Sequence, residues 1–163
     1  MSQYRTLARF NRWANERIYG CVAELPEPAY REDRGAFFGS VHNTLNHLLV
    51  LDRLWRGRLQ DTDLGVRSLD QILYDDFEAL RAERVLEDDR LIALADGYSE
   101  DDLAASLVYE SVDGSTYEVP VGLILNTLFN HQTHHRGQVH CLLTQSGITP
   151  PPLDILFFTK QFV

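Results

Sequence analysis

The chain has 163 residues, of which 44% are hydrophobic and 24% charged, and its formal net charge is -9. This composition excludes a disordered chain, and the acidic excess argues against nucleic acid as a partner, because that binding needs clustered lysine and arginine. No stretch approaches the roughly 20 consecutive apolar residues of a membrane span, and residues 1–15 mix arginines with polar groups, unlike a signal peptide. We therefore expect one cytoplasmic domain over residues 1–163.

The spacing of apolar residues predicts three helices within the first 98 residues. The first covers residues 4–25, and a polar loop follows to about residue 39. Ser40 is a candidate N-cap for a second helix that continues to residue 59. The third is expected over residues 68–98. Its apolar face is predicted to include Leu69, Ile72, Leu80, Leu91 and Leu94.

The pattern then changes to β-branched and aromatic residues over residues 106–119. The dipeptide Asp113-Gly114 suits a hairpin turn, because glycine accepts a positive φ. Pro120 suits the first turn of a helix, and an apolar face continues from there to residue 147. We predict a short β-hairpin followed by a fourth long helix.

Three consecutive prolines, residues 150–152, precede a final short apolar segment at residues 153–162. Long helices joined by short connections favour a helical bundle. The predicted fold is therefore mainly all-α, a four-helix bundle with a small β-hairpin and a short C-terminal helix.

Four of the six histidines fall between residues 131 and 140. His131 and His135 are four residues apart, so on a helix they lie within about 40° of each other, one turn apart. They share the apolar stripe, whereas His134 and His140 lie on its flanks. Burying an imidazole without a partner costs roughly 1–3 kcal/mol, and a metal ion bound by both rings would offset that cost. A lone histidine there is more often hydrogen-bonded core, but the pair favours a divalent metal.

A catalytic zinc-type site usually needs a third protein ligand and keeps one position open for water or substrate. The remaining histidines, His42 and His47, both lie on the second predicted helix, and spacing alone does not decide between them. His47 is preferred because it lies deeper along the helix and shares a side with Leu51 and Leu54.

Ordered motifs extend over nearly the whole chain. They are Phe10-Asn11-Arg12-Trp13-Ala14-Asn15, then Leu45-Asn46-His47 followed by Asp52 and Trp55, then His131-Gln132-Thr133-His134-His135-Arg136-Gly137-Gln138 followed by Leu142, Leu143 and Gly147, and finally Pro151-Pro152-Leu153-Asp154 with Phe157 and Phe158. In this order they resemble the DinB family of the DinB/YfiT-like superfamily, which is named after DNA-damage inducibility.

The resemblance implies a four-helix bundle in which one histidine of the second helix and two of the last long helix bind a divalent metal, commonly zinc or nickel. Carried over to this sequence, the ligands are His47, His131 and His135. Homodimers are frequent in the superfamily, which includes bacillithiol transferases and the mycothiol-dependent maleylpyruvate isomerase. For most DinB members no reaction is known, so the resemblance implies no substrate.

Three neutral imidazoles would leave the charge of the site near +2, which makes the metal a strong Lewis acid. Our first hypothesis is an enzyme that binds a low-molecular-weight thiol as thiolate, for S-transfer or thiol-assisted isomerisation. Metal-assisted hydrolysis is the second, and a stress-related dimer whose metal only joins helices is the third. A di-iron bundle needs Glu-x-x-His pairs, and the chain has none. No catalytic acid or base is assigned.

Other residues of these motifs have structural interpretations. Asp52 falls among apolar residues and is expected to pair with an arginine such as Arg136, or else to orient a ligand histidine. A close helix approach would explain Gly137 within a helix. Cys21 and Cys141 lack the CxxC spacing and are expected to be reduced packing residues.

Overall fold

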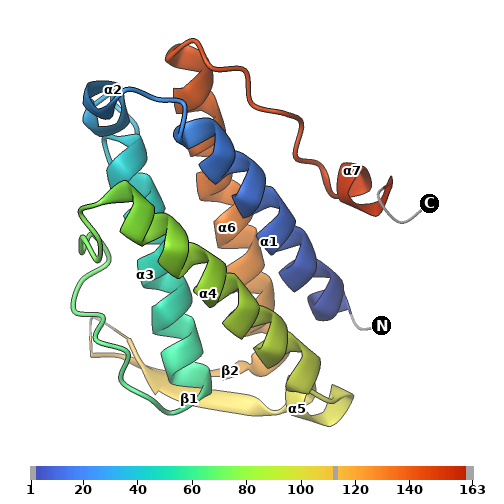
Figure 1. Cartoon of the computed structure of the whole chain (residues 1–163). Coiled ribbons are helices and arrows are strands. Elements are labelled where there is room, and N and C mark those ends of the chain that lie inside the picture. The colour runs from blue at the N-terminus through green and yellow to red at the C-terminus, as the bar shows by residue number, and fades with distance from the viewer. Residues whose placement is uncertain (1–2, 112–113, 161–163) are drawn as a thin grey trace.

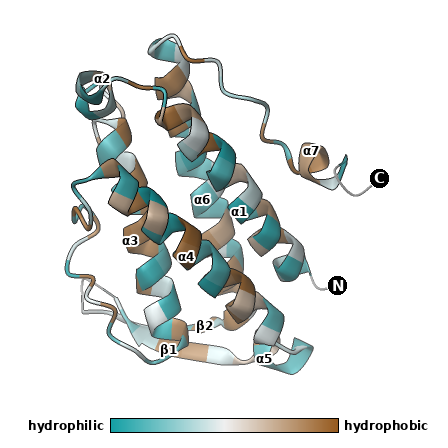
Figure 2. Ribbon diagram, viewed as in Figure 1, coloured by the Kyte–Doolittle hydropathy of each residue, from teal (hydrophilic) through white to brown (hydrophobic). Residues whose placement is uncertain are grey.

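Four long helices dominate the computed structural model, which describes residues 3–111 and 114–160 (Figure 1). They are α1 (Gln3–Val22), α3 (Val41–Leu59), α4 (Phe77–Gly97) and α6 (Val121–Gln145). Helix α1 packs against α4 and α6, and α3 packs against the same two helices. Hydrophobic and hydrophilic residues recur along the helices in turn, as amphipathic helices require (Figure 2). The predicted four-helix bundle is confirmed.

Helix α3 begins where the sequence predicts, because the Ser40 side chain accepts a hydrogen bond of 3.1 Å from the backbone N–H of Asn43. Its inward residues Leu45, Leu48 and Leu49 are almost fully buried. They pack with apolar residues of α1, α4 and α6 in one of the core clusters. The core thus fixes the rotation of α3 about its axis, which decides where its histidines point.

The third long helix begins later than predicted. It starts at Phe77, with the Asp76 side chain accepting from the backbone N–H of Ala79 at 2.8 Å, and residues 60–76 are mostly irregular. Leu69 and Ile72, which we expected on the apolar face of this helix, are 40% and 43% exposed. The predicted start near residue 68 is therefore wrong.

The side chain of Asn46 explains why α4 does not begin before Phe77. Its carbonyl oxygen accepts from the backbone N–H groups of Leu73 and Tyr74, and its amide donates to the carbonyl of Tyr74. This fully buried amide forms hydrogen bonds with backbone N–H and C=O groups that would otherwise bond to one another within a helix. The segment is consequently held against α3.

Two short helices that the sequence did not predict lie near the ends of the bundle. Helix α1 ends at Val22, a few residues before the predicted end, and the segment expected to be a loop contains α2 (Glu27–Arg31). After α4, Ser99 caps α5 (Glu100–Ala104) through a reciprocal pair of hydrogen bonds with Asp102.

The predicted hairpin is present. Strands β1 (Ser106–Glu110) and β2 (Thr116–Pro120) pair antiparallel, with Tyr109 opposite Tyr117. Gly114 has a φ of 81°, as the turn prediction requires, whereas Asp113 lies outside the described residues.

Prolines 150–152 lead to α7 (Ile155–Thr159). Its Phe158 packs edge-on against Phe10 and Trp13 of α1. The short C-terminal helix is thus confirmed, although residues 161 and 162 of the predicted segment lie outside the part of the chain described.

Buried ion pairs join α4 to α3. Arg84 lies 2.6 Å from Asp52 and 3.0 Å from Asp88, and all three side chains are at most 2% exposed. One turn along α4, Glu87 accepts two hydrogen bonds from Arg56. Each of these buried charges on α3 and α4 therefore has a partner of opposite sign, without which its burial would be costly.

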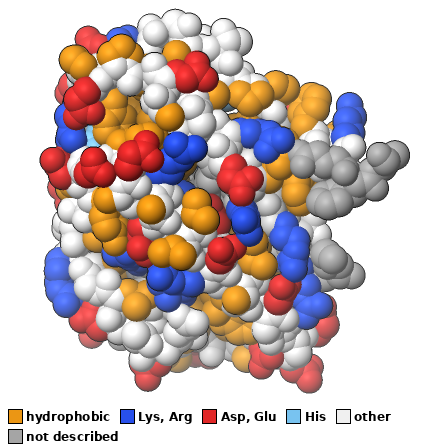
Figure 3. All heavy atoms as spheres, in the orientation of Figure 1, with side chains coloured by type: hydrophobic (Ala, Val, Ile, Leu, Met, Phe, Trp, Pro, Cys, Tyr) orange, Lys and Arg blue, Asp and Glu red, His pale blue; other side chains and the backbone are white. Residues whose placement is uncertain are grey.

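The surface carries both signs of charge, and acidic and basic side chains are interspersed over the face seen in Figure 3. Arg9, for example, pairs with Asp96 across α1 and α4. Among the residues described, no helix combines the length and the apolar character that crossing a membrane requires.

Candidate metal centre

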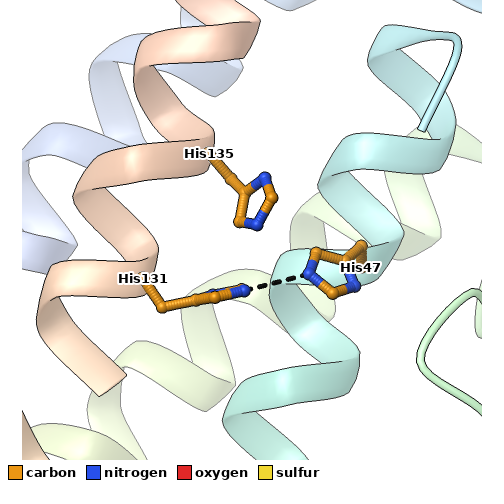
Figure 4. Close-up of side chains that lie close together, drawn as sticks. All are labelled: His47, His131 and His135. Carbon is orange, nitrogen blue, oxygen red and sulfur yellow. Dashed lines mark hydrogen bonds between the residues drawn. The ribbon is translucent and has the colours of Figure 1, made fainter. Parts of the chain in front are cut away.

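Three histidines converge between α3 and α6. His47 comes from α3, and His131 and His135 lie on successive turns of α6 (Figure 4). Each ring offers one nitrogen as a possible ligand atom, and these three nitrogens all lie within 4.8 Å of one another. The structure brings together all three residues that the sequence singled out as metal ligands.

Burial distinguishes these rings from the other histidines of α6. His47 and His135 are 4% and 7% exposed, and His131 is half-buried. His134 is exposed and His140 only partly buried, and neither belongs to the group, as the helical phase predicts. The i, i+4 spacing places two rings toward α3 because α3 and α6 pack directly on each other.

His42, the alternative third ligand, has another role. It is 4% exposed, its Nδ1 lies 3.0 Å from the hydroxyl of Tyr30, and its ring packs edge-on against that of Tyr30. His42 is therefore the ordinary case of a hydrogen-bonded core histidine. The choice of His47 over His42 agrees with this geometry.

Hydrogen bonds fix the orientation of two of the rings. His47 donates from Nδ1 to the backbone carbonyl of Leu69 at 2.7 Å, and His135 donates from Nδ1 to Oε1 of Gln138 at 2.8 Å. A protonated Nδ1 leaves the lone pair on Nε2, the atom available to a metal. The Leu69 carbonyl had no signal in the sequence, whereas Gln138, three residues after His135 on the helix, could have been found from spacing.

All three rings are neutral near pH 7. Burial lowers the pKa of His131 to about 3, with the neighbouring histidines acting in the same direction. Burial also lowers the pKa of His47 and of His135, against the opposing effect of their hydrogen bonds. Because a metal binds only the unprotonated nitrogen, the environment keeps each ring in its ligating form.

The spacing of the nitrogens fits a small divalent ion. Nε2 of His47 lies 3.0 Å from Nε2 of His131. Two nitrogens bound to one tetrahedral ion at zinc–nitrogen distances are about 3.3 Å apart, so this pair needs only a small shift. Nδ1 of His131 is buried and has no hydrogen-bond partner among the described residues, which leaves this ring less constrained than the other two.

Phe38 forms an aromatic wall of the centre that the sequence did not indicate. Its ring stacks on His47, with centroids 3.8 Å apart and planes 26° from parallel, and its centroid lies 5.5 Å from that of His135. The phenyl ring shields this side of the imidazoles from water. No motif pointed to Phe38, because it lies in the loop before α3.

The expectation that Asp52 pairs with Arg136 is wrong. Asp52 binds Arg84, and its Oδ2 also accepts from Gln132 at 2.6 Å, whereas Arg136 donates to Asn11. Burial raises the pKa of Asp52 to about 6, although Arg84 and Gln132 act in the opposite direction. The pairing is structural, as preferred, and links α3 to α4 instead of to the arginine beside the histidines.

Two further expectations need correction. Gly137 is exposed and a Cβ there would meet nothing within 4 Å, so close helix approach does not explain it. Cys21 is partly buried against the core, but Cys141 is exposed and is not a packing residue.

Comparison with known proteins shows the family to which the chain belongs. The family model described as "DinB family" matches residues 1–161. The chain belongs to the DinB family. The protein DinB of Bacillus subtilis (strain 168) is 27% identical over 163 residues, covering 94% of each chain. The crystal structure of a DinB-like protein from Bacillus cereus ATCC 10987 matches with a TM-score of 0.63 and 19% identity, over 86% of this chain and 90% of the other. Because the identity is 19%, the match to the Bacillus cereus structure shows that this DinB chain shares its fold, and no more than that.

Proposed function

We propose that this DinB-family chain is a divalent-metal-dependent enzyme whose three-histidine centre holds zinc or nickel and binds a low-molecular-weight thiol as the reacting substrate. The observation that carries the proposal is the convergence of three neutral imidazoles within 4.8 Å. A site with three protein ligands is the arrangement that catalytic zinc proteins use to keep a position for substrate.

The ligand set favours catalysis over a structural metal. Within the residues described, the group contains no cysteine, aspartate or glutamate beside the three histidines. A structural zinc site is almost always closed by a fourth protein ligand, usually a cysteine or histidine. His134, the next candidate on α6, is exposed and outside the group.

The residues around the centre favour a thiol over water as the nucleophile. A divalent ion bound here would supply Lewis acidity, which deprotonates a coordinating thiol outright and lowers the pKa of water. Hydrolysis usually needs a carboxylate or histidine as general base. The carboxylate of Asp52, which binds the side chain of Gln132 next to His131 in the chain, is fully buried and already accepts from Arg84 and Gln132, so it is not available for that role.

The chain's own residues would orient and shield the reacting group. The carbonyl of Leu69 and the side chain of Gln138 hold His47 and His135 with their Nε2 atoms directed to the centre. Phe38 covers one side, which excludes water and strengthens electrostatic interactions within the site. Transfer of the thiol to an electrophile, or thiol-assisted isomerisation, is the reaction class that this arrangement supports.

Spectroscopy of the cobalt-substituted protein tests the proposal. We expect cobalt to bind the wild-type chain, purified without a metal-affinity tag, and 2-mercaptoethanol to add a sulfur-to-cobalt charge-transfer band. Activity with that thiol and an alkylating substrate should exceed activity on ester or amide substrates. Cobalt binding without a thiol band would support a structural metal, and faster ester hydrolysis would support the second hypothesis, so either result would overturn the proposal.

A further inference from the structure

A pocket lies between α1 and α6, and none of the three clustered histidines lines it. Its volume of about 430 Å³ suits a small organic molecule. Phe10 and Phe129 contribute apolar walls, and Asn126, Asn130 and Thr133 contribute polar groups. The pocket therefore offers both an apolar surface and hydrogen-bonding groups.

Arg136 is the only charged residue that lines this pocket among the residues described. Its side chain is buried, with 3% of the residue exposed, yet it forms no ion pair within the described part of the chain. The group at Nη1 donates to the side-chain oxygens of Asn11 and Asn15, and Nη2 has only a long contact of 3.4 Å to Thr133. The guanidinium thus meets neutral acceptors, and its Nη2 side is weakly bonded.

The buried carboxylate of Asp88 does not take up this capacity. Asp88 accepts from the amide groups of Asn11 and Asn15, so two amides stand between it and Arg136. Arginine presents its donors in a planar fork that matches a carboxylate, and such charge-assisted bonds are about twice as strong as neutral ones. An anion in the pocket would therefore be a better partner for Nη2 than Thr133 is.

We propose that the pocket between α1 and α6 binds a small organic carboxylate that carries an aromatic or branched apolar group, with Arg136 as the anion-binding residue. The phenyl rings of Phe10 and Phe129 receive the apolar group, and the exposed amides of Asn126 and Asn130 border the carboxylate. A cation would be repelled by the sole charge of the lining. This binding does not depend on the metal centre.

Ligand-observed NMR with three probes of similar shape tests the proposal on the full chain. We expect benzoate to bind with a dissociation constant on the order of 1 mM or tighter, and benzamide and benzylamine to bind at least about tenfold more weakly. The His47→Ala variant, with metal removed by a chelator, should bind benzoate unchanged, which separates this pocket from the metal centre. Shift changes in the protein should concentrate on the side-chain amides of Asn126 and Asn130.

Variants at the exposed Asn126 are expected to keep the fold. Asn126→Asp should weaken benzoate binding about threefold, and Asn126→Lys should strengthen it by a similar factor, as surface charges do. Arg136→Lys keeps the charge without the planar fork and should weaken binding about tenfold. Equal affinity for benzoate and benzamide, or equal benzoate affinity in both Asn126 variants, would overturn the proposal even if the Arg136 variant failed to fold.

Discussion

Binding of zinc is expected to stabilise the folded chain because the ligands come from two helices. Free zinc at about one hundred times its dissociation constant adds about 2.7 kcal/mol to the free energy of unfolding. For a chain of 163 residues, each kcal/mol raises the melting temperature by about 2–4 °C, so a rise of about 5–11 °C is expected. His47→Ala removes the proposed ligand on α3 and leaves the proposed ligands His131 and His135 on α6. The metal then no longer links the two helices.

Differential scanning calorimetry with added zinc, and separately with a chelator, measures this effect. The wild-type chain should show the rise, and His47→Ala should lose most of it. His134→Ala is the matched control, since it removes an exposed histidine of the same helix that lies outside the group. If His47→Ala kept the full rise, or if the wild-type chain showed none, the ligand assignment would be refuted.

Four further substitutions test how the bundle itself is held together. Arg84→Met should lower the free energy of unfolding by about 3–5 kcal/mol in urea denaturation, because two buried carboxylates lose their partner. Burial would raise the pKa of Glu87, but Arg56, Arg84 and Arg90 together outweigh burial and lower this pKa. The contribution of Glu87 to stability is therefore present above its unfolded pKa and is lost as the pH falls through its lowered folded pKa. The stabilities of wild type and Glu87→Gln should therefore differ at pH 7 and converge as the pH falls through the lowered pKa of Glu87; parallel curves would contradict the assignment. Gly57→Ala should destabilise, since its Cβ would lie 2.6 Å from the carbonyl oxygen of Thr62, whereas Gly20→Ala, with nothing within 4 Å, should stabilise by about 0.5–1 kcal/mol.

Local patterns were sufficient to predict most of the bundle. Apolar residues spaced three and four apart placed α1, α3 and α6, and Ser40 located the start of α3. The same logic failed for residues 60–76, where the apolar Leu69 and Ile72 mimic a helical face. The side chain of Asn46, distant in sequence, binds that backbone and prevents the helix from starting earlier.

The candidate site was predictable to the same extent. Helical phase put His131 and His135 on one face and set His134 apart, because the 3.6-residue period is a property of each helix alone. Spacing alone left His42 and His47 open, since the choice depends on which turn of α3 faces α6 and on Tyr30 binding His42.

The sequence by itself determined α1, α3 and α6, their inward faces and the pair of imidazoles on α6, because these follow from dihedral preferences and the burial of apolar stripes. Only the tertiary structure decided the partners: the Leu69 carbonyl for His47, Phe38 as the wall of the centre, and Arg84 for Asp52. Partnerships of this kind depend on how separate elements pack against one another, and no period within a single element encodes that.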